Sequence, residues 1–220
     1  NQPVAFLDQS RDFNQHMKNP RIQLAKELNV KANDLVGVVN ATAGLNAVAQ
    51  SISLKEGDEI LTSDHEYGAL EKTWEYVAKT KKAKIVEVKV PIPLLSENQF
   101  VEAFKNKINK KTKILFISHI TSPTSLVFPL KKLIKEANKR GIISIIDGAH
   151  APGHIKLNIS DLKADFYSGN CHKWMMAPKG AAFLWANKNN KNILEPLVIS
   201  HGWLPNNYRK LQKGEFSNDR

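Results

Sequence analysis

The stretch KILFISHITSPTSLVFPLKKLIKEANKRGIISIIDGA, residues 113–149, decides the fold class of this chain. Two apolar runs, 113–120 and 142–149, stand at its ends and show no alternation of apolar and polar residues, which indicates strands buried on both faces. Between them, apolar side chains recur at helical spacing: Leu130, Leu133, Ile134 and Ala137. Gly141 then supplies a helix stop. A helix between two doubly buried strands predicts a parallel sheet covered by helices.

The same alternation of strand and helix patterns extends over most of the 220 residues. The other runs predicted as strands are 34–40, 58–64, 84–90, 164–169 and 181–187. The segments predicted as helices are 42–54, 69–81, 97–108 and 129–141. Ser96 and Gln99 form a capping-box pattern at the start of the third helix. We therefore predict an α/β fold, a three-layer sandwich around a mainly parallel seven-stranded sheet.

The composition limits the classes of partner. The 32 basic and 21 acidic residues give a net charge of +11, which invites a nucleic-acid interpretation. The lysines, however, are scattered over predicted helices and the loops that end them, and no RRM, zinc-finger or helix-turn-helix signature accompanies them. A solvated basic face is the better interpretation, so we expect no nucleic-acid partner.

Membrane and metal partners are not expected either. No run of eighteen apolar residues is present, and residues 1–20 lack a basic-then-apolar leader. The single cysteine, Cys171, excludes an intrachain disulfide framework and a multi-cysteine zinc site. We expect a reducing, cytoplasmic setting and no metal.

Polar side chains follow the predicted strands at the edge where parallel sheets bind ligands. Thr42 and Ala43 lie in a small-residue turn that opens a helix, which suits an anion, although an ordinary helix N-cap explains the turn as well. His65 and Tyr67 follow the second strand and could stack on a flat ligand or simply belong to a loop. Ser122 lies in a hydroxyl-rich turn.

Asp147 and Lys173 are the two residues whose surroundings most favour chemistry. Asp147 ends a buried apolar strand, so its carboxylate requires a salt bridge or a cationic ligand such as a protonated ring nitrogen. Lys173 lies among apolar and aromatic residues, which disfavour the ammonium form and leave an amine able to condense with an aldehyde. Cys171 has no evident base and is better explained as a buried structural thiol.

Five segments in this order carry a family resemblance: NATAGLN (40–46), SDHEYGA (63–69), SHITSPTS (118–125), IDGAHAPG (146–153) and SGNCHKWMMAPKG (168–180). The chain resembles the class V branch of the fold-type I pyridoxal-phosphate (PLP) enzymes over roughly residues 20–203. It is most similar to isopenicillin N epimerase-like proteins, and more distantly to cysteine desulfurases and selenocysteine lyases. The resemblance implies the large domain of the PLP-dependent transferase fold, with PLP as cofactor.

The resemblance also implies roles around the cofactor ring. Lys173 would form the internal Schiff base, and Asp147 would pair with the pyridinium nitrogen. His150 would hydrogen-bond the phenolic oxygen, with Ser122 at the same edge. His65 would stack on the ring as a catalytic residue, with Tyr67 as the alternative.

For the phosphate group, the resemblance implies contacts from Thr42 and the Ala43 backbone at the start of a helix. His172 would add a second contact, helped by Ser168 or Asn170. The spacing SGNCHK is longer than the corresponding SGHK of desulfurases, which leaves the assignment between Ser168 and Asn170 open.

The resemblance predicts three parts of the chain and several partners. Residues 1–33 are expected to be an incomplete N-terminal helical lead-in, 34–203 the PLP-binding large domain, and 204–220 the start of a connection to a small C-terminal domain. The expected enzyme is a homodimer, with its active site at the interface, that removes the α-proton of an amino acid in an external aldimine. An epimerase or aminotransferase is favoured. The alternatives are a cysteine desulfurase or C–S lyase, and a truncated or non-catalytic binding domain with a basic surface.

Overall fold

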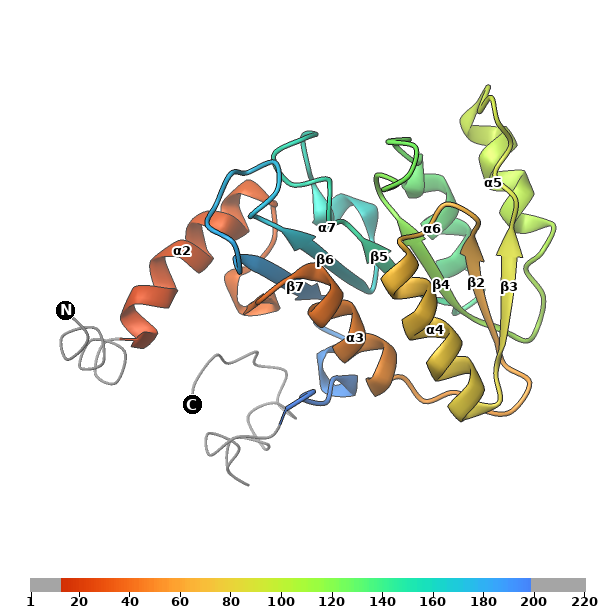
Figure 1. Cartoon of the computed structure of the whole chain (residues 1–220), viewed down its shortest axis with the longest axis horizontal. Coiled ribbons are helices and arrows are strands. Elements are labelled where there is room, and N and C mark those ends of the chain that lie inside the picture. Colours follow the sequence, from red (N-terminus) through yellow and green to blue (C-terminus); the bar gives the residue numbers. More distant parts are fainter. Residues whose placement is uncertain (1–12, 199–220) are drawn as a thin grey trace.

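The computed structural model of the chain describes residues 13–198. A seven-stranded sheet forms its middle layer, in the order β1-β7-β6-β5-β4-β2-β3 (Figure 1). The strands are β1 (Leu35–Val38), β2 (Glu59–Ser63), β3 (Lys84–Val88), β4 (Thr112–Ser118), β5 (Ile143–Asp147), β6 (Phe166–Asn170) and β7 (Ala182–Ala186). β7 runs antiparallel to β1 and β6, and the pairs from β6 to β3 are parallel. The predicted mainly parallel sheet is confirmed.

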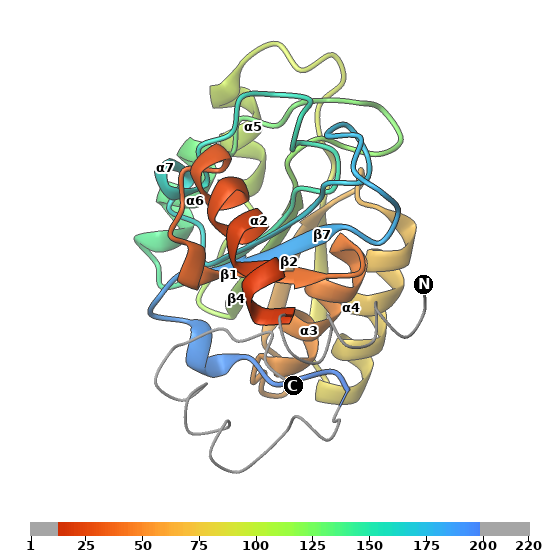
Figure 2. The same cartoon turned by 90° about the vertical axis from the view of Figure 1, so that its left-hand side faces the viewer.

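Helices cover both faces of this sheet (Figure 2). One face carries α3 (Ala41–Ser51) and α4 (Gly68–Lys81), and the other carries α2 (Phe13–Glu27), α5 (Glu97–Lys105), α6 (Leu130–Asn138) and α7 (Ile159–Leu162). Two short 3-10 helices, η1 (Ala32–Asp34) and η2 (Lys191–Ile193), complete the described elements. The predicted three-layer sandwich is therefore confirmed.

Strand β4 shows why the apolar runs lack alternation. Leu115 and Ile117 pack in the apolar cluster beneath α5 and α6, whereas Ile114 and Phe116 pack in the cluster beneath α3 and α4. All four side chains are buried. Each contributes about 1.5–3 kcal/mol of transfer free energy when fully removed from water, so both faces of the central strands stabilise the fold.

The helix N-caps fix where the chain leaves the sheet. The Asn40 side chain accepts a hydrogen bond from the Ala43 N–H at the start of α3. Ser96 does the same for the Gln99 N–H at α5, as predicted, and Gln99 Oε1 accepts from the Leu95 N–H. At α3 and α5 the chain therefore enters the helix through a hydrogen-bonded cap.

The predicted three-part division is described only in part. Helix α2 belongs to the expected N-terminal lead-in, residues 1–33, but residues 1–12 of that segment and all of 204–220 lie outside the described residues. Within residues 13–198, no helix is long and apolar enough to cross a membrane.

Candidate active site

Five strand ends enclose a cavity of about 210 Å³ at the carboxyl edge of the sheet. Its lining is Asn40, Thr42, Tyr67, Ser118, Ile120, Ser122, Asp147, Ala149, His150, Asn170, His172 and Lys173. Eight residues singled out in the sequence meet here: Thr42, Tyr67, Ser122, Asp147, His150, Asn170, His172 and Lys173. Side chains up to 131 positions apart in the chain therefore share one polar site.

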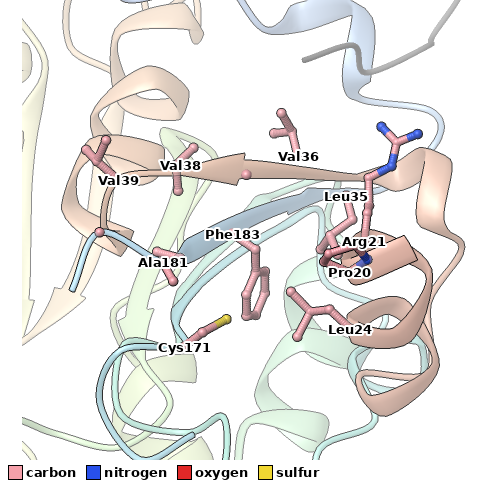
Figure 3. Close-up of a pocket in the computed structure, with 13 residues that line it drawn as sticks. Pro20, Arg21, Leu24, Leu35, Val36, Val38, Val39, Cys171, Ala181 and Phe183 are labelled. Carbon is pink, nitrogen blue, oxygen red and sulfur yellow. The ribbon is translucent and has the colours of Figure 1, made fainter. Parts of the chain in front are cut away.

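A larger cavity of about 550 Å³ lies between α2 and the edge formed by β1 and β7 (Figure 3). Leu24, Val38 and Phe183 are typical of its lining. Its polar side groups are Arg21 and the thiol of Cys171, with no set of convergent acids and bases. We therefore place the candidate active site in the smaller cavity, since a few convergent polar and titratable groups distinguish a reactive site better than volume does.

Asp147 presents a carboxylate with spare acceptor capacity. It is 4% exposed, and its Oδ1 accepts a hydrogen bond of 2.9 Å from the Ala149 N–H. Oδ2 accepts no hydrogen bond from the part of the chain that the structure describes. Burial raises the pKa of Asp147 to about 6, against the hydrogen bond from Ala149 and the charge of Lys173. A cationic N–H donor in the cavity would satisfy this carboxylate.

Lys173 faces the same cavity with its amine beside a histidine. Its Nζ lies 2.9 Å from His150 Nε2. Desolvation lowers the pKa of Lys173, although the charge of Asp147 opposes this shift. Burial, with the neighbouring Lys173 and His154, also lowers the pKa of His150. Both groups are therefore biased toward their neutral forms, and neutral lysine is the nucleophilic form.

The N-terminus of α3 provides a place for an anion. Ala41 donates its N–H to Asn170 Oδ1 at 2.8 Å, and the Ala43 N–H is bound by Asn40 Oδ1 at 2.7 Å. The Thr42 N–H has no acceptor among the described residues, and Thr42 lines the cavity. The Ala43 backbone is thus already occupied by the helix cap, contrary to our expectation, and Thr42 supplies the open donor near the positive end of the helix dipole.

His172 also lines the cavity. Its Nδ1 is 2.9 Å from the Ala181 carbonyl oxygen, so Nδ1 carries a proton and donates it in this contact. Nε2 then remains as the ring nitrogen that can bind a ligand.

The structure does not bring His65 to the cavity. Its ring is buried, lies 6.3 Å from the ring of Phe128, and holds Nδ1 2.8 Å from Asp64 Oδ1. Tyr67, our alternative, lines the cavity and is 46% exposed. Because Asp64 and Phe128 fix the imidazole behind the loop, the aromatic ring available for a flat ligand is that of Tyr67.

Ser168 is likewise absent from the cavity lining. Its fully buried hydroxyl donates to the Phe183 carbonyl oxygen at 2.7 Å, beneath α3. A Cβ on Gly44 would lie 2.5 Å from Ser168 Oγ, which shows how closely the helix covers this serine. Asn170, two residues further along β6, reaches the cavity instead and binds the start of α3.

Glu66 is a second buried acid that the sequence reasoning missed. Its Oε2 accepts from the Ser118 N–H at 2.8 Å and from Ser118 Oγ at 2.6 Å, and its Oε1 accepts from Ser63 Oγ. Burial first, and the charge of Asp147, raise the pKa of Glu66 to about 7. Glu66 lies three residues after the end of β2, close to the carboxyl edge where β5 ends at Asp147, and that position was the available signal.

Comparison with known proteins identifies the family. The model of the family Aminotransferase class-V matches residues 5–208. The chain belongs to this family. The arrangement of Asp147 and Lys173 around one cavity is thus found in a class-V chain.

Several curated and solved proteins are similar to this class-V chain. The isopenicillin N epimerase of Amycolatopsis lactamdurans is 36% identical over 206 residues, which cover 92% of this chain and 51% of that protein. A probable chloroplastic L-cysteine desulfhydrase of Arabidopsis thaliana is 28% identical, over 85% of this chain and 44% of that protein. The solved cysteine desulfurase CsdA of Escherichia coli superposes with a TM-score of 0.76 at 25% identity, covering 83% of this chain and 46% of that one. The chain spans about half the length of the curated relatives it matches.

The cysteine of this class-V chain lies outside the lining of the site cavity. Cys171 is buried, and burial raises the pKa of its thiol. Its sulfur instead lines the larger apolar cavity (Figure 3). A raised pKa disfavours the thiolate, which is the reactive form of cysteine. This placement agrees with our interpretation of Cys171 as a structural thiol.

Proposed function

We propose that this chain is the cofactor-binding part of a PLP-dependent enzyme that acts on an amino acid. One observation carries the proposal. A single cavity holds a buried carboxylate with a free acceptor oxygen, a lysine whose pKa is lowered, and a helix N-terminus with an N–H group free to donate among the described residues. This donor set fits PLP, which has a ring nitrogen, an aldehyde and a phosphate. When bound, PLP supplies an electron sink that stabilises negative charge at the α-carbon of the substrate.

The chain's own residues divide the chemistry in this proposal. Asp147 would accept a hydrogen bond from the protonated ring nitrogen and so favour the cationic ring. Lys173 anchors the aldehyde and then serves as the base that moves the proton at the substrate's α-carbon. His150 and Ser122, which line the same cavity, would bind the phenolic oxygen, and Tyr67 would cover the ring face.

The phosphate is assigned to the N-terminus of α3. The Thr42 N–H and hydroxyl are the proposed donors, and the ring of His172 is the proposed third contact. Asn170 holds the Ala41 N–H in place at 2.8 Å and so orients this end of the helix. In this proposal residues 34–203 form the PLP-binding domain, with 1–33 leading into it and 204–220 leading out.

Among reactions, epimerisation or transamination is favoured. The 36% identity to an isopenicillin N epimerase supports this choice. Desulfurase or C–S lyase chemistry is the second candidate, because a desulfhydrase and a desulfurase are also similar to the chain. The burial and raised pKa of Cys171 argue against this cysteine as a sulfur carrier. A non-catalytic binding role for the +11 chain is the alternative of another class.

Two further expectations belong to the same proposal. The site is completed across a homodimer, where a partner subunit and a following domain contribute to the phosphate and to the substrate carboxylate. The cytoplasm is the proposed compartment, because the single cysteine needs no oxidising environment.

Profiling of the full-length protein with PLP and single amino acids tests the proposal. Exchange of the α-hydrogen with deuterium, keto-acid formation and sulfide release are followed in parallel, with Lys173→Ala as control. We expect the native protein to exchange the α-hydrogen of one amino acid and the Lys173→Ala variant to exchange none. Absence of exchange with every amino acid, together with salt-sensitive retention on a polyanion, would favour the binding role.

A further inference from the structure

Trp174, the residue after Lys173, has a contact that no role above uses. It is 48% exposed, yet its indole Nε1–H donates to His150 Nδ1 at 3.3 Å. Its ring also stacks on His154, with centroids 4.3 Å apart and planes at 30°. The two loops approach closely here, since a Cβ on Gly153 would lie 2.6 Å from the backbone carbonyl carbon of Trp174. The indole is therefore held on the far side of His150 from the lysine.

The hydrogen-bonding chemistry of Trp174, His150 and Lys173 determines which of their nitrogen atoms carry protons. An indole nitrogen can only donate, so His150 Nδ1 is the acceptor in this contact. A neutral imidazole with a free Nδ1 carries its proton on Nε2, and Nε2 lies 2.9 Å from Lys173 Nζ. The Nε2–H then donates to the lone pair of Nζ, which only an uncharged amine possesses. An ammonium at Lys173 would place two donors against each other.

We propose that Trp174 is a positioning residue which, through the tautomer of His150, holds Lys173 as a free amine. The same tautomer gives His150 a donor, Nε2–H, that faces the cavity. The inference rests on the proposed function only in that this amine anchors the cofactor.

Other groups around His150 and Lys173 both favour and oppose positive charge on these two side chains. The titratable groups that face His150 and Lys173 from the neighbouring loops are Tyr67, Asp147, His154 and His172. Asp147 favours the ammonium form of Lys173 and desolvation opposes it, whereas desolvation first, then the charges of Lys173 and His154, lower the pKa of His150. A specific hydrogen bond that selects the neutral tautomer thus offsets the attraction of Asp147.

Imidazole nitrogen NMR on the cofactor-free full-length protein tests the proposal directly. His150 is assigned by the signal that His150→Gln removes. The native protein should show one neutral tautomer with the proton on Nε2. Trp174→Phe keeps an aromatic ring on His154 but loses the indole N–H. In this variant His150 should populate both neutral tautomers, and its affinity for a proton should rise roughly threefold to tenfold. Met176→Ala, at an exposed site of the same loop, should change neither quantity.

Lysine reactivity gives a second measurement that needs no cofactor. The rate of reductive methylation of Lys173 by formaldehyde and a borane is followed against pH, with peptide mass mapping. We expect the midpoint of this rate to move to higher pH in Trp174→Phe and to stay in Met176→Ala. An Nδ1–H tautomer in the native protein, or a Trp174→Phe variant unchanged in both measurements, overturns the inference. Because neither measurement uses PLP, both outcomes stand even if the proposed function fails.

Discussion

Replacing Glu66 by glutamine tests the energetics of the buried acid beside Asp147. Glutamine keeps the size of glutamate, and its carbonyl oxygen can accept both hydrogen bonds from Ser118, while its amide can donate to Ser63 Oγ. Glu66→Gln therefore resembles the protonated carboxyl of Glu66. The variant removes the ionised form, which burial disfavours, and retains the contacts that join β2 to β4.

The size of the expected stability difference follows from the pKa of Glu66, which is raised from 4.5 to about 7. Between these values the folded protein keeps a proton that the unfolded chain has released, so the free energy of unfolding falls as pH rises. A shift of this size corresponds to about 3 kcal/mol. At pH 8, Glu66→Gln should be more stable than the native protein by up to this amount, and at pH 4.5 the two should be similar.

Urea denaturation of the cofactor-free protein at pH 4.5, 6 and 8 measures this difference. Glu71→Gln, at an exposed position of α4, is the matched control and should follow the native protein. Glu66→Ala, which leaves the donors of Ser118 without an acceptor, should be destabilised at all three pH values by about 1–3 kcal/mol or more. A stability difference between Glu66→Gln and the native protein that does not grow from pH 4.5 to 8, or a Glu66→Gln variant weaker than native at pH 8, would refute the reasoning.

Three further outcomes are expected. Gly148→Ala should lower the free energy of unfolding by about 1–3 kcal/mol, because the new Cβ would lie 2.0 Å from the Tyr167 ring; a thermal unfolding temperature equal to native contradicts this. Asn40→Ala should lower the free energy of unfolding by about 1 kcal/mol through loss of the α3 cap, measured by urea denaturation, and an unfolding free energy equal to native contradicts this. Tyr67→Ala should raise the dissociation constant for PLP in a fluorescence titration more than His65→Ala does, and the reverse order would restore His65 as the ring contact.

The sheet and its layers could be predicted from the sequence because the signal is local. In β4 and β5, continuous apolar runs mark burial on both faces, and the helical period between them marks the crossover. The end of each strand is then fixed within about two residues. Asp147 and Lys173 were found for the same reason, since a charged residue beside an apolar run is visible without knowing its partners.

The missed features depend on contacts between distant segments. Asp64 and Phe128 hold the ring of His65 away from the cavity, and nothing local in DHEYG shows this. The Ala43 amide is occupied by Asn40, a choice made by the cap geometry. Glu66 acquires its role only when β2 and β4 pair and bring Ser118 to it. Such pairings belong to the folded chain and leave no periodic pattern.

Borohydride reduction of the full-length protein with PLP, followed by peptide mass mapping, tests the central claim most directly. Reduction fixes the cofactor covalently to the lysine that anchors it. We predict that the labelled peptide contains Lys173 and that Asp147→Asn lowers the labelled fraction at limiting PLP. A label on Lys179 or on any other lysine, or no label in the native protein, would contradict the account of this cavity as a PLP site.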